Sequence, residues 1–286
     1  MSAAAHAGRR RRRPPRFYFS LRSPYSWLAY RDLLDRYPRT AAAVEWVPFF
    51  EPDELSRKLL AEAGGAFPYT PMSPEKHRYI LQDVRRLAAE RGLAFTWPVD
   101  REPVWEVPHL GYLVAARHGR GARYIELAAR ARWELGLDIC DRSVIGGFGP
   151  ELGLDPEELA AASDASDASE LRAEGVRVLL EIQRDGVFGV PFFVDHYDKY
   201  WGVDRLPAFA AALAAKGVAG PDVPPAADLG AQHPADLGAQ HLAELGTLHP
   251  ADPADPADPG GIPEHSGIPL PAPAPSVDDG HAGGCG

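Results

Sequence analysis

The sequence predicts an α/β fold in which a long helical segment interrupts the sheet, and two observations carry this prediction. Short runs rich in aromatic and β-branched residues, which favour strands, occur at 16–21 and 44–50 and again at 188–201. The segment 108–162 between them has apolar residues at helical spacing and no strand pattern. We therefore expect two separated α/β pieces to join in one sheet, with the intervening helices as an insertion.

The first piece is expected to run from strand to helix to strand. Residues 16–21 read RFYFSL, which is typical of a short strand. Ser23 followed by Pro24 predicts a helix start, because serine is a favoured N-cap and proline a favoured first helical residue. A second strand is expected at 44–50, VEWVPFF. A helix that joins two strands in this way predicts a parallel pair.

The remaining elements are mostly helices, followed by a hairpin. Helices are expected at 74–91, 108–118, 122–135, 156–162 and 168–185. A strand at 188–194, which contains Pro191, and an edge strand around Tyr200 and Trp201 are expected to pair. Asp204 is expected to cap a last helix over 207–215.

This order of elements is that of a thioredoxin fold split by a helical insertion. We expect residues 16–52 and 166–215 to form the thioredoxin-like domain and residues 53–165 to form the helical insertion domain. A basic arm over 1–15 is expected to be disordered. So is a tail over 216–286, because it is built mainly of Pro, Ala, Gly, Asp and His and contains PADPADPADP.

The charge and hydropathy patterns argue against several functional classes. Residues 217–286 hold ten acidic and no basic residues, which accounts for the whole formal net charge of −10. The arginine run 9–13 could bind nucleic acid or an anionic membrane, but no aromatic residues interleave with it, so a solvated arm is preferred. No apolar run could span a membrane and no secretory signal is evident. We expect a cytoplasmic protein without nucleic-acid or membrane partners.

Familiar catalytic motifs are missing from the sequence. The two cysteines, Cys140 and Cys285, form no C-x-x-C pair, and the histidines lack ligand spacing, so neither a disulfide nor a metal site is expected. No G-x-S-x-G elbow, P-loop or G-x-G-x-x-G motif occurs.

Ser23 and the Val190–Pro191 pair are the positions where chemistry is most plausible. Ser23 sits where a helix N-terminus favours an anion such as a thiolate, and its hydroxyl could donate a hydrogen bond to a bound sulfur. From this segment alone, a plain N-cap is the safer interpretation. From this segment alone, a trans proline that starts an edge strand is the preferred interpretation of Pro191, because cis bonds are a small minority; the alternative is a cis proline that lets the Val190 backbone pair with a ligand's peptide group.

Three segments taken together resemble the 2-hydroxychromene-2-carboxylate isomerases. They are FYFSLRSPYSWLA at 17–29, KHRYILQDVRRLAAERGLAF at 76–95, and 186–206, which begins GVFGVPFFV and ends YWGVDRL. The wider group includes kappa-class glutathione transferases and DsbA-type oxidoreductases. The resemblance covers about residues 16–215 and implies a thioredoxin-like domain with an inserted all-helical domain, and a homodimer.

The resemblance also implies roles for individual residues. Ser23 matches the serine that activates the glutathione thiol, and Val190–Pro191 match the cis-proline pair that holds the glutathione backbone. Asp204 matches the residue that contacts the γ-glutamyl end of glutathione. Lys76 and Tyr79 match a stretch beside the mouth of the site, where Lys76 is expected to help bind the thiol cofactor and Tyr79 to line the substrate pocket. Where redox relatives carry C-x-x-C, this chain reads SPYS, so disulfide exchange of that kind is not expected.

The resemblance therefore implies an isomerase that acts on a conjugated, carbonyl-activated double bond of a small molecule, assisted by glutathione or another low-molecular-weight thiol. Aromatic side chains are expected to line the substrate pocket: Tyr25, Trp46, Phe49, Phe192 and Trp201. Three alternatives stay open: a thiol-independent E/Z isomerase of secondary metabolism, a kappa-like glutathione transferase or peroxidase, and a non-catalytic binding domain.

Overall fold

A four-stranded mixed sheet in the order β2-β1-β3-β4 is the centre of the fold. The computed structural model describes residues 13–68, 72–164 and 169–222. Strand β1 (Arg16–Phe19) pairs in parallel with β2 (Glu45–Pro48) and antiparallel with β3 (Phe192–Asp195), and β3 pairs antiparallel with β4 (Asp198–Trp201). The predicted parallel pair and hairpin are confirmed, and with them the predicted fold class.

Burial explains why these short strands are stable. Every residue of β1 and β3 is buried, whereas β4 at the edge is largely exposed. Phe17 stacks on Phe193 with ring centroids 5.0 Å apart, and Phe193 stacks in turn on Phe209 at the same distance. Cross-strand aromatic pairs of this kind add to the stability that comes from burial alone.

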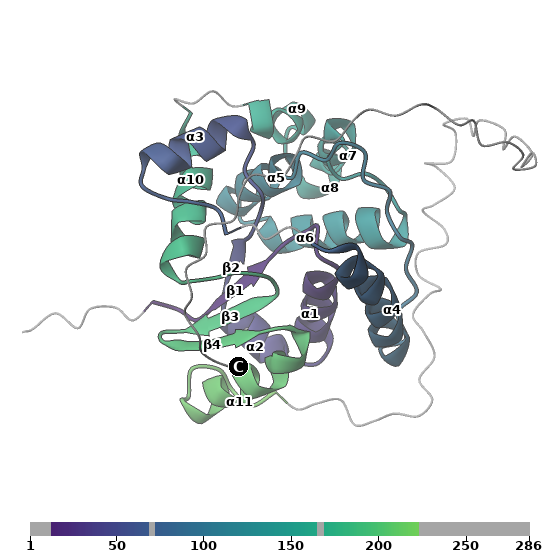
Figure 1. Cartoon of the computed structure of the whole chain (residues 1–286), viewed down its shortest axis with the longest axis vertical. Coiled ribbons are helices and arrows are strands. Elements are labelled where there is room, and N and C mark those ends of the chain that lie inside the picture. Colours follow the sequence, from purple (N-terminus) through teal and green to yellow (C-terminus); the bar gives the residue numbers. More distant parts are fainter. Residues whose placement is uncertain (1–12, 69–71, 165–168, 223–286) are drawn as a thin grey trace, which may run out of the picture. The chain divides into compact units, whose positions relative to one another are not determined.

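Four helices pack around the sheet, and Figure 1 labels them beside the strands. They are α1 (Pro24–Asp35), α2 (Pro38–Ala43), α10 (Glu170–Arg184) and α11 (Leu206–Ala215). Helix α2 has no side-chain cap of its own at Tyr37. Asp222 replaces that cap: its carboxylate accepts from the N–H groups of Arg39 (2.7 Å) and Thr40 (3.2 Å) and from the Thr40 hydroxyl (2.6 Å).

Between β2 and α10 every regular element that the structure describes is a helix or a helical turn, and loops such as 93–104 join them. The segment comprises α3 (Glu54–Glu62), α4 (Pro74–Glu90), α5 (Glu106–Arg117), α6 (Gly121–Ala129), a π-helical turn over Arg130–Glu134, and the short helices α7 (Arg142–Gly146), α8 (Gly149–Leu152) and α9 (Pro156–Ala160). Figure 1 shows α5, α7, α8 and α9 close together in the upper part of the view. None of the described helices is both long and apolar enough to cross a bilayer.

A buried charge cluster ties this helical segment to α10. Nη1 of Arg172 lies 3.0 Å from the Asp53 carboxylate, 2.7 Å from Ser56 Oγ and 3.3 Å from Glu106 Oε2. The Asp53 N–H also donates to Glu106 Oε2 at 3.1 Å. The cluster thereby fixes the first turn of α5 against α3 and α10.

Several element boundaries differ from the predictions. The short helices α2, α3, α7 and α8 were not predicted, and α5 begins at Glu106, two residues before the expected start. The expected helix 122–135 changes to a π-helical turn at Arg130. Pro191 does not start an edge strand, because β3 lies inside the sheet, and its peptide bond is cis, so the trans edge proline is wrong.

The tail was expected to be disordered from residue 216, but the structure describes residues 216–222. Lys216 pairs with Asp195 and Asp198, and Asp222 caps α2, so the start of the tail is tied to the fold. The rest of the disorder expected over 1–15 and 216–286 concerns 1–12 and 223–286, which lie outside the described residues. The domain boundaries stay a prediction.

Candidate active site

The turn between β1 and α1 carries Ser23. The Ser23 N–H donates to the carbonyl of Ser20 at 3.1 Å, and the Ser23 hydroxyl accepts from the Ser26 N–H at 3.2 Å. Ser23 is therefore the N-cap of α1, as predicted, with extended backbone angles and Pro24 at the first helical position. The first turn of α1 holds no acidic side chain, so nothing offsets the positive end of the helix dipole there.

The cap leaves the Ser23 hydroxyl proton free. A serine hydroxyl has one donor and two acceptor lone pairs, and the cap occupies only one lone pair. In the described part of the chain, the Ser23 O–H donates to no acceptor, and the side chain is half-buried rather than enclosed. Ser23 can therefore cap the helix and donate to a ligand at the same time.

Strand register brings Val190–Pro191 to the same end of the sheet as Ser23. Tyr18 pairs with Phe192 in antiparallel strands, so the chain that leaves β1 passes the residues that precede β3. The Val190–Pro191 peptide bond is cis. Among the described residues, neither the N–H nor the C=O of half-buried Val190 has a hydrogen-bond partner. Unpaired backbone groups at this position can pair with an extended ligand.

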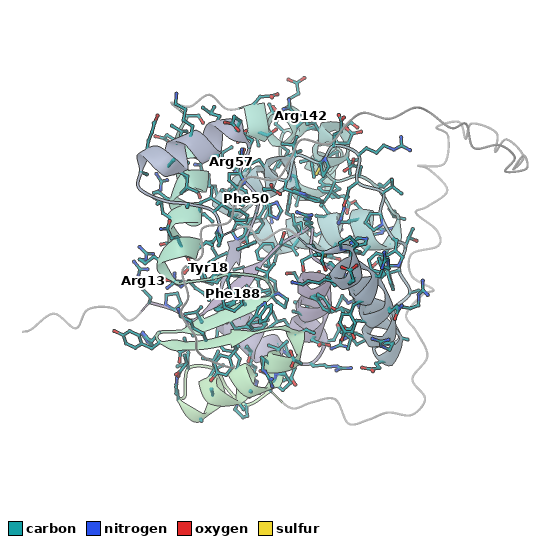
Figure 2. The ribbon with its side chains drawn as sticks, viewed as in Figure 1. Arg13, Tyr18, Phe50, Arg57, Arg142 and Phe188 are labelled. Atoms are coloured by element: carbon teal, nitrogen blue, oxygen red, sulfur yellow. The ribbon has the colours of Figure 1, made fainter. Side chains whose placement is uncertain are left out.

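An exposed aromatic surface adjoins this backbone. Phe188 and Trp201 are 57% and 53% exposed, with ring centroids 4.9 Å apart, and Figure 2 labels Phe188 beside the sheet. Gly189 lies directly under Trp201, because a Cβ there would come within 3.1 Å of the indole nitrogen. Phe192 is only 1% exposed, and its ring centroid lies 5.3 Å from that of Phe188. It therefore supports this surface from the core and does not line it.

Helix α4 reaches the site through Tyr25. The Tyr25 hydroxyl donates to Asp83 at 2.8 Å, and burial together with this bond raises the pKa of Tyr25. Tyr79 lies one turn before Asp83 on α4. Its side chain is 57% exposed, and the Arg86 guanidinium lies over its ring. Lys76 is exposed in the first turn of the same helix. Asp83, which the sequence did not single out, thus joins Tyr25 to α4, and the expected roles of Lys76 and Tyr79 stay predictions.

Three other predicted residues have less direct connections to Ser23. Asp204 does not cap the last helix, which begins without a side-chain cap. It lies in a 3-10 turn over Val203–Arg205 with its carboxylate exposed. Its place beside the site is set by Gly202, whose N–H donates to the Pro191 carbonyl at 3.0 Å. Trp46 packs edge-on against Phe17 in the core (4.9 Å), whereas half-buried Phe49 donates its N–H to the carbonyl of Phe19 at the end of β1 (2.6 Å).

His109 is a residue of this site that sequence patterns missed. It lies on α5 and is fully buried, and its Nε2 accepts from the backbone N–H of Leu21, two residues before Ser23, at 3.1 Å. No motif could have indicated this, because the two partners are 88 residues apart. In the described ranges, no group of three or more His, Cys, Asp or Glu side chains is placed to hold a metal ion.

Comparisons with known proteins agree with this fold. A 2-hydroxychromene-2-carboxylate isomerase of Sphingobium xenophagum is 26% identical over 193 residues, which cover 66% of this chain and 92% of that protein. A solved 2-hydroxychromene-2-carboxylate isomerase has a TM-score of 0.52 at 20% identity, over 71% of this chain and 95% of its own. A probable DsbA oxidoreductase from Streptomyces coelicolor has a TM-score of 0.50 at 21% identity, over 70% and 88%. A family model for the DSBA-like thioredoxin domain matches residues 16–214, and the chain belongs to that family.

Proposed function

We propose that this chain is an isomerase of a carbon–carbon double bond conjugated to a carbonyl group, with a low-molecular-weight thiol as its cofactor. The observation that carries the proposal is the bonding of the Ser23 hydroxyl. It caps the N-terminus of α1 through one lone pair, and its proton is free to be donated to a ligand. Further support comes from the curated relative named 2-hydroxychromene-2-carboxylate isomerase, 92% of which this chain matches.

The groups around Ser23 suit a peptide-like thiol such as glutathione. The unpaired N–H and C=O of Val190 would pair with the ligand's peptide groups as an added strand does. The Ser23 hydroxyl would donate to its sulfur, and the exposed Asp204 carboxylate would receive its ammonium group. The strand register that brings Val190 to the end of the sheet near Ser23, and the bond from Gly202 to Pro191 that joins the Asp204 turn to this segment, support the proposal.

Ser23 would act by stabilising negative charge on sulfur. A hydrogen bond to the thiolate, together with the N-terminus of α1, lowers the pKa of the bound thiol. When bound, the thiol supplies a nucleophile that adds to the conjugated carbon and leaves again once the carbon–carbon bond has rotated. Ser23 then holds the sulfur through both steps, and no oxidant or reductant is consumed.

The aromatic surface would receive the planar part of the substrate. Phe188 and Trp201 expose ring faces beside Val190, and a conjugated carbonyl compound can stack on them. Tyr25, two residues after Ser23, is held by Asp83 of α4, so its ring would offer a further fixed contact for the substrate. On this proposal, the binding surface would draw on both the α/β part and helix α4.

Calorimetric titration with glutathione, and then with mycothiol, tests the thiol mechanism. Ser23→Ala is expected to weaken thiol binding by about tenfold, because a hydrogen bond to a charged group is lost. Ser169→Ala is the matched control: Ser169 is also a half-buried N-cap, and its hydroxyl accepts from the Arg172 N–H at 3.1 Å. Both variants lose a cap of about 1 kcal/mol, so only a site effect separates them.

Each outcome of this titration has a definite meaning. Saturable binding that Ser23→Ala weakens and Ser169→Ala preserves supports the thiol-assisted isomerase. If neither thiol binds the parent protein, the thiol mechanism is wrong, and the thiol-independent E/Z isomerase becomes the leading hypothesis for the same aromatic surface. That the chain acts as a homodimer in the cytoplasm stays a prediction, which analytical ultracentrifugation and cell fractionation would test.

A further inference from the structure

Both ring nitrogens of His109 have partners, and the partners belong to different parts of the fold. Nδ1 lies 2.6 Å from the carbonyl oxygen of Trp105 on its own helix. Nε2 lies 3.1 Å from the backbone nitrogen of Leu21 and 3.5 Å from Ser20 Oγ, both in the turn that precedes Ser23. The imidazole thereby bridges α5 to the strand-to-helix turn.

These partners select one neutral tautomer. The Trp105 carbonyl can only accept, so the proton must be on Nδ1, and the Leu21 N–H can only donate, so Nε2 must present its lone pair. Phe50 stacks on the imidazole at 5.3 Å and separates it from water. Burial, the largest effect, lowers the pKa of His109 to about 4, which agrees with a neutral ring.

Ser20 passes this anchoring on to Ser23. The Ser20 carbonyl accepts from the Ser23 N–H at 3.1 Å, and the Ser20 N–H donates to Ser26 Oγ at 3.2 Å. Ser20 Oγ accepts from the Arg22 N–H at 3.3 Å as well as contacting His109. The chain from Ser20 to Ser26 is thus one hydrogen-bonded unit, which His109 attaches to α5 and which Tyr25 attaches to α4 through Asp83.

We propose that His109 is a positioning residue for the Ser23 site: its neutral imidazole holds the Ser20–Leu21 backbone in place, so that Ser23 and the N–H groups of α1 face the bound ligand. The bond to Trp105 satisfies Nδ1 within the same helix, whereas Nε2, which is equally buried, takes its partner from the turn before Ser23. The bond to Leu21 thereby links the first turn of α5 to the residues next to Ser23. The effect of His109 on catalysis rests on the proposed thiol mechanism. Its effect on the placement of residue 23 does not depend on that mechanism.

Two substitutions separate the two hydrogen bonds of His109. In His109→Asn the amide can replace Nδ1 and donate to Trp105, but it is too short to reach Leu21. In His109→Gln the amide oxygen can replace Nε2 and accept from Leu21. The control is Tyr124→Phe, which removes a buried hydrogen bond of 2.7 Å to the Pro108 carbonyl and does not touch the turn.

The readout is the thiol pKa of a Ser23→Cys variant, followed by thiolate absorbance at about 240 nm in the presence of a phosphine reductant. The absorbance of each protein is compared with that of the same protein with serine retained at position 23. The difference removes the absorbance of Cys140 and Cys285. Adding His109→Asn is expected to raise this pKa by roughly half a unit, because the helix N–H groups are held less well against the thiolate. Adding His109→Gln or Tyr124→Phe is expected to leave it unchanged.

Equal shifts with His109→Asn and His109→Gln, or no shift with either, would overturn the proposal. The tautomer gives a test that needs no substitution of a buried residue: ¹⁵N NMR of the parent at neutral pH should show a proton on Nδ1 and none on Nε2. A proton on Nε2 would overturn the proposal by itself. Failure of both glutathione and mycothiol to bind would overturn the thiol mechanism alone, since titration of Ser23→Cys requires no ligand.

Discussion

Replacing Glu106 by glutamine is expected to change how the stability of the fold depends on pH. The Glu106 side chain is fully buried, and its Oε1 has no hydrogen-bond partner in the described part of the protein. Burial first, and the neighbouring Asp53 carboxylate second, raise the pKa of Glu106 from 4.5 to about 7. The single guanidinium of Arg172, 3.3 Å away, opposes this shift without cancelling it.

The sign and size of the effect follow from linkage. A carboxyl whose pKa is raised by folding stabilises the fold below its unfolded pKa, and this stability is lost as the pH rises through the folded value. A shift from 4.5 to about 7, at about 1.4 kcal/mol per unit, corresponds to roughly 3 kcal/mol. Glutamine does not titrate, so the parent should gain roughly 3 kcal/mol over Glu106→Gln between about pH 8 and pH 4.5.

Urea unfolding followed by far-UV circular dichroism at several pH values measures this difference. The difference is needed because His109 acts in the opposite direction: its lowered pKa of about 4 stabilises the fold above its unfolded value, and that stability is lost as the pH falls towards 4. Glu90→Gln, an exposed change at the end of α4, should give a constant difference. If the difference in free energy of unfolding between Glu106→Gln and the parent does not change with pH, the reasoning is refuted. If the difference changes with the opposite sign, Arg172 keeps Glu106 ionised.

Two further predictions concern single side chains. Asp222→Ala should lower the free energy of unfolding by about 1 kcal/mol in urea, because α2 loses the carboxylate that caps Arg39 and Thr40, whereas Asp222→Asn should nearly preserve it; equal losses in both variants would contradict the capping role. Burial raises the pKa of Cys140 to about 12, so iodoacetamide should label Cys140 slowly in the native protein and rapidly in urea, as followed by mass spectrometry. Equal labelling rates in the two conditions would contradict this expectation.

Local signals were enough to predict the order of elements. Ser23–Pro24 marked the start of α1 because a capping hydroxyl and a fixed proline angle act within one turn of helix. The runs at 16–21 and 188–194 gave β1 and β3 because aromatic residues favour buried strands. Short helices such as α2 were missed, because its cap, Asp222, comes from the far end of the described chain.

The site was only partly predictable, since its key contacts are long-range. Asp204 was expected to cap α11 because aspartate is a favoured N-cap, but the 3-10 turn over Val203–Arg205 places it one residue too early. Phe192 belonged to an all-apolar strand, and such a strand does not indicate which side chains reach the surface. The contact of His109 with Leu21 depends on how α5 packs, which no spacing in the sequence encodes.

The Ser26 hydroxyl bears on how this chain relates to its redox relatives. Ser26 is 2% exposed, and its oxygen accepts the Ser20 N–H at 3.2 Å, so the fold itself uses the second serine of SPYS. Sulfur is larger and a weaker acceptor than oxygen, and a cysteine at this position would loosen the turn that the hydroxyl now holds. Replacing both serines by cysteines would therefore disturb the architecture as well as change the chemistry. A dithiol could be introduced into this turn only with compensating changes nearby, because the Ser26 oxygen is already in structural use.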